Sequence, residues 1–347
     1  MTEWTFDFTA SFHSYLSPGC KICHQGASLV LFVTGHCKRG CFYCPLSAAR
    51  RGKDHIFANE RRVEGMKDIL DEAHAIGALG TGITGGEPLL ELDLVVRCLK
   101  SLKKEFGEEH HVHLYTGSLP GSSVMNKLRQ AGLDEIRFHP PISDWARPHR
   151  LEDTLKEAKS MGLAAGVEIP VLEPAPLVVE AVKRADAFLN LNELEFSETN
   201  RLGLEEHGFI SKEFDCGALG SEEMAREHFM IDGLRVHYCS SRFKDAVQLR
   251  ERLKRRAERT SRPFDLPTAD GTLVYGTITC DDLGLALNML KILDVPPEMY
   301  SLTDGRLEIA GWILESISED MKATGSILAL EERYPVEEGP VVERIPL

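Results

Sequence analysis

Short apolar segments alternate with longer amphipathic segments between residues 27 and 196. The apolar segments have the length of buried strands, and the amphipathic segments repeat apolar residues at helical spacing. Strands that alternate strictly with helices favour a parallel sheet with right-handed crossovers. The predicted strands span residues 27–34, 80–83, 111–116, 135–139, 165–171 and 188–196. The predicted helices span residues 62–76, 92–106, 123–131, 151–161 and 177–187.

The order of elements changes after residue 271. Four predicted strands and two predicted helices follow in the order β-α-β-β-α-β, which is ferredoxin-like and indicates a small α+β domain. Residues 260–271 contain Pro263, Pro267 and Asp270-Gly271 and are predicted to be a linker. The expected organisation is an N-terminal arm (1–26), an α/β region with a following helical segment (27–259) and a C-terminal domain (271–347).

Composition indicates a soluble enzyme. The chain has 347 residues, of which 43% are hydrophobic, enough for one large domain or a large and a small one. No apolar run approaches 18 residues, and residues 1–12 lack a basic start followed by an apolar core, so we expect a cytoplasmic chain that neither spans a membrane nor is secreted. The net charge of -14 argues against a general nucleic-acid-binding surface.

Three cysteines follow the first predicted strand, with the spacing C-x3-C-x2-C at Cys37, Cys41 and Cys44. Three thiolates suit a [4Fe-4S] cluster with one iron left open to a substrate or cofactor, whereas four would close the cluster. Structural zinc prefers two C-x2-4-C pairs, or cysteine with histidine. Unrelated reduced cysteines are the remaining alternative.

A second motif, Thr84-Gly85-Gly86-Glu87-Pro88, ends the second predicted strand. Two glycines leave bare backbone beside whatever lies at the end of that strand. Gly80, Gly82 and Gly85 also match the dinucleotide fingerprint G-x-G-x-x-G, which requires a helix to begin at the third glycine. Pro88 disfavours helix in the residue before it, so the context excludes a dinucleotide site.

Together the two motifs resemble the radical S-adenosylmethionine (SAM) superfamily, including enzymes related to pyruvate formate-lyase activating enzyme. The resemblance implies that the three cysteines hold three irons of a [4Fe-4S] cluster and that SAM chelates the fourth. It also implies a fold: an α/β partial (β/α)6 barrel, followed here by the ferredoxin-like domain. The residues that it places at SAM are Tyr43, near the adenine, and Gly85, Gly86 and Glu87, at the methionyl ammonium.

In a barrel of this kind the reactive groups lie at the carboxyl ends of the strands. Arg137 and Glu168 have apolar neighbours, so they need partners if they point inward. His113 and His139 could transfer protons, although a structural role fits either of them better. Thr116 and Arg137 are further candidates for SAM contacts. The candidates for catalysis or substrate contact are His139, Glu168, Asn192, Glu195, Glu198 and Asn200, with Glu168, Glu195 and Glu198 as the catalytic candidates.

A second metal is a further possibility. Cys20 and Cys23 have the chelating spacing C-x2-C, and two more ligands must come from elsewhere. Cys216 and Cys239 are in loop-like contexts after the sixth strand and could complete a zinc site or a second iron-sulfur cluster. His24 and His237 are alternative ligands, and separate reduced thiols are the alternative to any metal.

Residues 244–262 form a predicted helix with eight basic and three acidic side chains. Such a helix could meet phosphate or RNA, but it has no interleaved aromatic residues for base stacking, and a solvated face bonded to acids is the commoner outcome.

The resemblance implies that a reduced cluster gives one electron to SAM and that the resulting 5'-deoxyadenosyl radical takes hydrogen from an unidentified substrate. It implies an external reductant of the ferredoxin or flavodoxin type. Three functions remain open: an enzyme acting on a small molecule, a modifier of RNA or of a protein, and a non-enzymatic metal scaffold. Glycyl-radical activation belongs to the second, although such activases are usually shorter and lack a C-terminal domain of this size.

Overall fold

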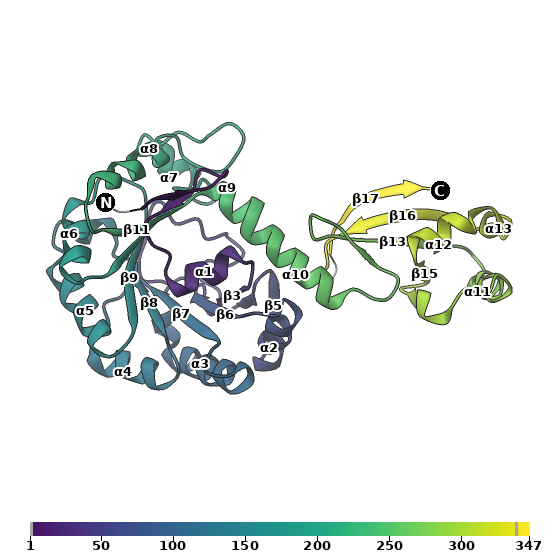
Figure 1. Cartoon of the computed structure of the whole chain (residues 1–347), viewed down its shortest axis with the longest axis horizontal. Coiled ribbons are helices and arrows are strands. Elements are labelled where there is room, and N and C mark those ends of the chain that lie inside the picture. Colours follow the sequence, from purple (N-terminus) through teal and green to yellow (C-terminus); the bar gives the residue numbers. More distant parts are fainter. Residues whose placement is uncertain (1–2, 337–338) are drawn as a thin grey trace. The chain divides into compact units, whose positions relative to one another are not determined.

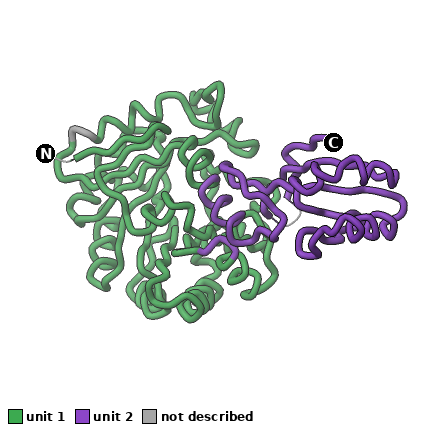
Figure 2. The backbone as a smooth tube through the Cα atoms, turned by 45° about the vertical axis from the view of Figure 1, so that its right-hand side comes forward, with its two compact units in different colours: residues 1–74, 78–249 green, residues 75–77, 250–347 purple. Residues whose placement is uncertain are grey.

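The computed structural model describes residues 3–336 and 339–347. The chain forms two compact units, coloured separately in Figure 2. Unit 1 comprises Met1–His74 and Ala78–Leu249, and unit 2 comprises Ala75–Gly77 and Arg250–Leu347. The division therefore falls at residue 249, whereas the sequence grouped residues up to 259 with the barrel. Within unit 2, the side chain of Arg256 donates a hydrogen bond to the carbonyl of Pro335, which ties this stretch to the C-terminal part of the chain.

Unit 1 is built on a parallel sheet that curves around helix α1 (Pro18–His24) (Figure 1). The sheet order is β11-β10-β9-β8-β7-β6-β3, and short antiparallel strands extend both edges. The parallel strands are β3 (Ser28–Phe32), β6 (Gly80–Thr84), β7 (His111–Thr116), β8 (Glu135–Phe138), β9 (Ala164–Pro170), β10 (Phe188–Asn192) and β11 (Arg235–Cys239). The edge strands are β1 (Thr5–Phe6), β2 (Phe12–His13), β4 (Ile56–Ala58) and β5 (Arg61–Val63).

Helices connect the parallel strands, as the apolar pattern predicts. In the longest of them, Val95, Leu99 and Leu102 are fully buried at helical spacing, while Lys100 and Lys104 are exposed. The connecting helices are α2 (Met66–Ala75), η1 (Pro88–Glu91), α3 (Leu92–Phe106), α4 (Ser122–Gln130), η2 (Ile142–Asp144), α5 (His149–Ser160) and α6 (Pro176–Arg184).

One predicted helix begins later than expected. The sequence placed its start at Arg62, but Arg61–Val63 form the edge strand β5 and α2 starts at Met66. The Asp68 carboxylate accepts hydrogen bonds from the backbone N–H groups of Glu64 and Gly65, at 2.9 and 3.2 Å. This carboxylate satisfies donors ahead of the first helical turn and defines the start of the helix.

A seventh parallel strand was missed. β11 pairs with β10 over five residues, so the prediction that Cys239 lies in a loop is wrong. Val236 and Tyr238 are buried on one side of β11, and His237 and Cys239 are buried on the other. The polar inner face hides the usual strand pattern. The remaining elements between β10 and unit 2 are α7 (Arg201–Glu206), α8 (Ser221–Arg226), η3 (Glu227–Met230), α9 (Ser241–Phe243) and the π-helical η4 (Lys244–Leu249).

Unit 2 carries the predicted ferredoxin-like arrangement. Its antiparallel sheet has the order β14-β15-β13-β16-β17, with β12 paired to β13, and its apolar core includes Leu290, Leu307 and Leu314. The second helix predicted after residue 271 is two short helices, and β17 was not predicted. The elements are α10 (Arg250–Thr260), β12 (Leu266–Pro267), β13 (Leu273–Thr279), α11 (Leu283–Ile292), η5 (Pro297–Met299), β14 (Tyr300–Thr303), β15 (Arg306–Ile309), α12 (Gly311–Ser316), α13 (Ser318–Lys322), β16 (Ile327–Arg333) and β17 (Val341–Pro346).

In the part of the chain that the structure describes, no helix combines the length and the apolar content needed to cross a bilayer.

Candidate functional site

The three clustered cysteines lie on one loop after β3, at the carboxyl end of the parallel strands. Cys37 is exposed, and Cys41 and Cys44 are half-buried. Backbone hydrogen bonds close the base of the loop, from Gly35 N–H to Lys53 O at 2.9 Å and from Gly52 N–H to Gly35 O at 2.8 Å. Three thiols with no fourth cysteine on the loop fit the donor set of a [4Fe-4S] cluster that keeps one iron open.

The glycine motif packs directly against the cysteine loop. β3 and β6 are neighbours in the sheet, so both motifs leave the same edge side by side. Gly86 N–H donates to Thr34 O at 2.7 Å, and Glu87 N–H donates to His36 O at 2.8 Å. A Cβ added to Gly85 would lie 2.7 Å from Thr34 O, closer than any real side chain comes. Only bare backbone fits between the two loops, as the sequence predicts.

The Glu87 carboxylate is buried and joins three loops. It accepts hydrogen bonds from the Thr116 hydroxyl at 2.7 Å, from Gly117 N–H at 3.1 Å and from the Ser118 hydroxyl at 3.0 Å. It also forms an ion pair with Arg39 at 3.2 Å. Arg39 in turn donates to the carbonyl of Gly117. Glu87 therefore fixes the cysteine loop, its own loop and the end of β7 relative to one another. The sequence did not single out Arg39, and its position between two cluster cysteines is the signal that could have done so.

Tyr43, which is buried, and His139, which is half-buried, lie next to each other after the end of β8. His139 Nδ1 lies 2.8 Å from the carbonyl of Glu168, so this nitrogen carries the proton and Nε2 is left as an acceptor. The Tyr43 hydroxyl lies 3.4 Å from that Nε2. Burial lowers the pKa of His139 and raises the pKa of Tyr43, so both groups are neutral at physiological pH. Asn200 helps to hold Tyr43 in place, because its side-chain amide donates a hydrogen bond to the carbonyl of Tyr43 at 3.0 Å.

The inner face of the barrel is polar, and Arg137 is its centre. Its guanidinium donates to the Glu135 carboxylate at 2.6 Å, to the Tyr115 hydroxyl at 2.8 Å, to the Glu168 carboxylate at 2.9 Å and to the Ser17 hydroxyl at 3.0 Å. Burial opposes ionisation of Glu135, but Arg137 outweighs it, and the pKa of this carboxyl lies well below its usual range. Arg137 and Glu168 both point inward and have partners, as an apolar neighbourhood requires.

The remaining candidates at the strand ends differ in burial and in hydrogen-bond partners. Asn192 donates to Glu168 at 2.9 Å, and Glu195 forms an ion pair with Lys244, the first residue of η4. Glu198 is exposed. His113 is buried beneath α1, where burial holds its pKa well below the usual range, and a structural role fits it better than proton transfer. Glu135 and Lys244 were not singled out by the sequence, because their importance depends on side chains that are distant in the chain.

Helix α1 fills the lower part of the barrel. Its N-cap Ser17 and the N–H of Gly19 both donate to the Glu135 carboxylate, at 2.9 and 3.1 Å. A Cβ on Gly19 would lie 2.6 Å from Arg137 Nη2, so only glycine allows this close approach. Helix α1, which carries the C-x2-C pair Cys20 and Cys23, is therefore part of the barrel interior.

The four cysteines of the predicted second metal site have different surroundings. Cys20 and Cys239 are buried, and burial raises the pKa of both thiols. Cys216 is exposed, and its nearest charges are those of Glu195, Asp245 and Lys244. The rings of His24 and His237 lie 5.4 Å apart. No group of three or more His, Cys, Asp or Glu in residues 3–336 and 339–347 is arranged around one point for a metal ion, the open cysteine loop included. The second metal remains a prediction.

The basic segment 244–262 makes mainly internal contacts. Within unit 2, Arg255 donates to the carbonyls of Ile76 and Gly77, and Lys254 pairs with Glu251. Arg262 pairs with Asp265 and Glu308. These contacts match the expected solvated and bonded face, and they give no support to RNA binding.

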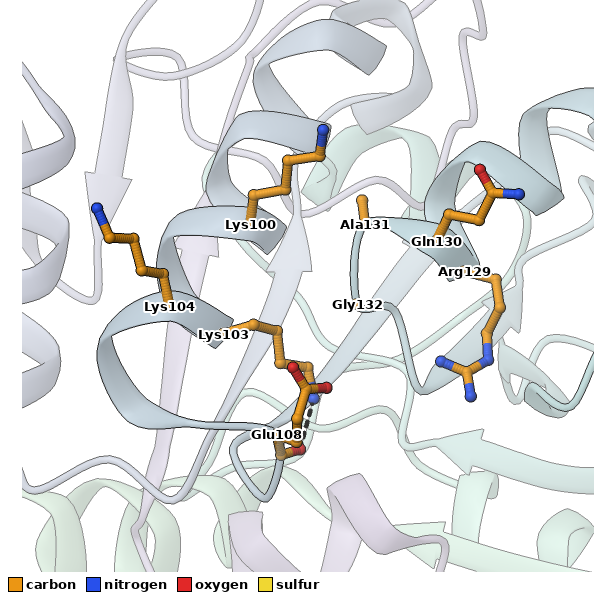
Figure 3. A pocket seen from close by; sticks show the side chains of 8 residues that line it. All are labelled: Lys100, Lys103, Lys104, Glu108, Arg129, Gln130, Ala131 and Gly132. Atoms are coloured by element: carbon orange, nitrogen blue, oxygen red, sulfur yellow. Dashed lines mark hydrogen bonds between the residues drawn. The ribbon is translucent and has the colours of Figure 1, made fainter.

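A recess of about 490 Å³ lies at the last turns of α3 and α4 (Figure 3). Lys103 forms part of its wall and is already neutralised by Asp134 at 2.8 Å. Because α3 begins after the glycine motif and runs back toward the start of β7, its last turn lies at the opposite end of the barrel from the cysteine loop. The recess is therefore separate from the candidate site.

The comparisons with known proteins agree with the geometry. The sequence profile of the Radical SAM superfamily matches residues 31–172, and that of a domain of unknown function (DUF8061) matches residues 271–347. A protein of Methanocaldococcus jannaschii, provisionally named a glycyl-radical enzyme activating enzyme, is 38% identical over an alignment of 350 positions that covers 96% of this chain and 93% of that protein. The chain belongs to the radical SAM superfamily. It is therefore an enzyme, and the scaffold hypothesis is wrong.

A partial sequence match and a structural likeness are further findings. A PqqA peptide cyclase of Granulibacter bethesdensis is 28% identical over 156 residues, 44% of this chain and 36% of that protein. A crystal structure of Streptococcus suis SuiB bound to S-adenosylmethionine has a TM-score of 0.45 and 17% identity, and covers 63% of this chain and 52% of that chain.

Membership of the superfamily defines the cofactors and the first step of the reaction. The enzyme uses a [4Fe-4S] cluster and SAM, and it cleaves SAM reductively to a 5'-deoxyadenosyl radical that abstracts hydrogen from its substrate. The electron comes from an external reductant.

Proposed function

We propose that this radical SAM enzyme activates a partner protein by taking a hydrogen atom from a backbone glycine of that partner. The observation that carries the proposal is the Methanocaldococcus jannaschii relative, whose name describes this activity and whose similarity extends over 96% of the chain. A match of that length includes the C-terminal unit. The presence of a C-terminal domain counted against an activating enzyme in the sequence analysis. The match shows that a protein named as an activating enzyme has a similar C-terminal region.

We assign the cluster to Cys37, Cys41 and Cys44, because they are the three thiols on the exposed loop beside the glycine motif. The backbone of Gly85 and Gly86 packs against the cysteine loop, and we place the methionyl group of SAM beside it, next to the cluster. The Thr116 hydroxyl, at the end of β7, holds the Glu87 carboxylate of this motif in place. Arg137, whose donors meet four protein groups, orders the barrel interior instead of contacting SAM. Tyr43 lies beside His139 at the wall of the proposed adenine site.

An exposed apolar segment beside the cysteine loop supports a protein substrate. In α7 and the loop that follows it, Leu202, Ile210, Phe214 and Leu219 are all exposed, with Phe214 at 93%. This segment contacts the cysteine loop, because the His207 ring stacks on Phe42 with 3.7 Å between ring centroids. Large apolar side chains gathered on one exposed segment are typical of surfaces that bind another protein.

The polar groups at the strand ends also suit hydrogen-atom transfer without a proton-transfer step. Glu168 is held by Arg137 and Asn192, and Glu195 is held by Lys244. Because both carboxylates are engaged by these partners, they position neighbouring side chains and do not act as free bases. In the proposed step the C–H bond of the glycine breaks homolytically, 5'-deoxyadenosine forms with that hydrogen, and the unpaired electron stays on the glycine Cα.

The test uses a glycyl-radical enzyme from the source organism with deuterium at its glycine Cα positions. Incubated anaerobically with the reduced enzyme and SAM, it should transfer one deuterium into 5'-deoxyadenosine and acquire a glycyl radical visible by electron paramagnetic resonance. A partner with its target glycine replaced by alanine is the matched control and should give neither signal. Deuterium transfer from a labelled metabolite pool, with no dependence on the partner protein, would show that the substrate is a small molecule.

A further inference from the structure

The loop that carries the three cysteines is basic. Residues 36–53 contain Lys38, Arg39, Arg50, Arg51 and Lys53 and no acidic residue, in a chain of net charge -14. Cations in an otherwise acidic protein create a local positive field that attracts a negatively charged partner. The relevant question is which of these charges face solvent.

Two of the five cations are committed to the protein. Arg39 pairs with Glu87, and the Arg50 guanidinium packs over the Phe57 ring at 4.2 Å. Lys38, Arg51 and Lys53 are exposed. Arg51 donates to the carbonyl of Cys44 at 3.0 Å, a contact that leaves its charge uncompensated. The ammonium groups of Lys38 and Lys53 have no hydrogen bond or ion pair with any residue that the structure describes.

These three charges surround the exposed edge of the cysteine loop. The hydrogen bonds between Gly35 and residues 52 and 53 bring the end of the basic segment back to its start, so Lys53 and Arg51 flank the same loop as Lys38. Cys37, next to Lys38, is the most exposed of the three cysteines. Asp54, the acid that follows the segment, is bonded to His36 at 2.7 Å. The positive charges therefore lie on the same loop as the most exposed of the three cysteines.

We propose that Lys38, Arg51 and Lys53 form the docking surface for an acidic ferredoxin that delivers the electron for SAM cleavage. One electron leaves the ferredoxin and enters the cluster, and no bond or proton changes in this step. A ferredoxin of the plant type has a low reduction potential and suits the reduction of a low-potential cluster. Charge at an interface rim mainly speeds association and makes it sensitive to salt. The inference rests on the proposed assignment of the cluster to the three cysteines and is independent of the proposed protein substrate.

The test compares two double charge reversals in the full-length enzyme. Lys38→Glu with Lys53→Glu changes the proposed surface, and Lys100→Glu with Lys104→Glu makes the same change in net charge on α3, at the opposite end of the barrel (Figure 3). The readouts are the Kd of purified acidic ferredoxin by calorimetry, the ferredoxin KM for 5'-deoxyadenosine formation, and the rate with dithionite as reductant.

The Lys38/Lys53 variant should bind ferredoxin at least roughly tenfold more weakly, and the KM for ferredoxin should rise in parallel. Ferredoxin binding should lose most of its dependence on salt concentration. The rate of 5'-deoxyadenosine formation with dithionite should stay unchanged. The Lys100/Lys104 variant should match the unmodified enzyme. Equal effects in both variants, or no change in KM, would overturn the proposal. A parallel fall in the dithionite-driven rate would show that the two lysines act on the cluster itself. An effect confined to a flavodoxin donor would overturn the choice of ferredoxin.

Discussion

The Glu87 carboxylate shows how one side chain organises the candidate site. Its oxygens accept from the Thr116 and Ser118 hydroxyls and from Gly117 N–H, and they pair with Arg39. The resemblance to the radical SAM superfamily placed Glu87 at the SAM ammonium. The structure adds that its removal would also leave buried donors without an acceptor.

Replacing Glu87 by alanine should weaken SAM binding and leave the cluster in place. A lost charge-assisted hydrogen bond costs roughly 1.5–3 kcal/mol, or on the order of tenfold to a hundredfold in Kd. Anaerobic calorimetry with SAM measures the effect, and iron analysis checks the cluster. Glu108→Ala, at the recess on the opposite end of the barrel, is the control and should bind SAM normally. An unchanged Kd for Glu87→Ala would place this residue away from the SAM site.

The three cysteines of the exposed loop should be individually essential. Replacing Cys37, Cys41 or Cys44 by alanine removes one of only three thiolate ligands, so the reconstituted protein should lose the cluster absorbance and form no detectable 5'-deoxyadenosine with dithionite and SAM. Cys280→Ser, in unit 2, should retain both properties. Turnover by the triple alanine variant would contradict the assignment of the cluster.

At the scale of elements, α1 depends on contacts that only glycine permits. A methyl group on Gly19 would lie within 3.0 Å of both Arg137 and His113, inside the barrel. Gly19→Ala should therefore lower the free energy of unfolding of unit 1 by roughly 1–3 kcal/mol, the usual cost of overpacking a close-packed interior. Denaturant unfolding followed by circular dichroism measures this change. Gly65→Ala, where an added Cβ meets nothing within 4 Å, is the matched control. Equal effects of the two substitutions would show that the close packing of α1 inside the barrel does not contribute to stability.

Three neighbouring histidines, His13 on β2, His24 on α1 and His237 on β11, should make stability depend on pH. Burial lowers the pKa of His24 to about 4 and holds that of His237 well below its usual range. Neither nitrogen of His237 has a hydrogen-bond partner among the described residues. As the pH falls from 6.5 toward 4, the unfolded chain binds protons that the folded chain does not, so the free energy of unfolding should decrease over this interval.

The variant His237→Phe removes one group that titrates only in the unfolded chain over this interval. Its free energy of unfolding should fall less between pH 7 and pH 5 than that of the unmodified protein, as measured by denaturant titration at each pH. His149→Gln, at an exposed position, should leave the slope unchanged. An unaltered slope in His237→Phe would mean that this imidazole takes up protons equally in the folded and the unfolded chain, contrary to the lowered pKa.

At the scale of the whole molecule, the two units separate radical formation from the C-terminal domain. Unit 2 has its own apolar core, and the proposed cluster and SAM residues all belong to unit 1. A chain that ends at Ser261 should therefore bind the cluster and cleave SAM with dithionite, but should form much less glycyl radical on a partner protein. Loss of dithionite-driven cleavage with an intact fold would show that unit 2 is needed for the first step itself.

The sequence by itself determined the elements whose pattern is local. The predicted helix 92–106 and strand 111–116 have the bounds of α3 and β7, because apolar residues at helical or strand spacing must face one core. It also identified the two loop motifs, whereas the pairing of β3 with β6 that brings them together comes from the structure. The ferredoxin-like order of unit 2 followed from the same local pattern.

Only the tertiary structure decided what fills the barrel. α1 has seven residues, too few to be stable alone, and its place depends on Glu135 and Arg137, more than a hundred residues away in the chain. β11 escaped prediction because His237 and Cys239 face a polar interior, where the rule that buried side chains are apolar does not apply. The local pattern of apolar residues identifies the faces of helices and strands from which water is excluded. The partners of a buried charge come from distant strands, so only the folded chain shows which residues hold Arg137 and Glu87 in place.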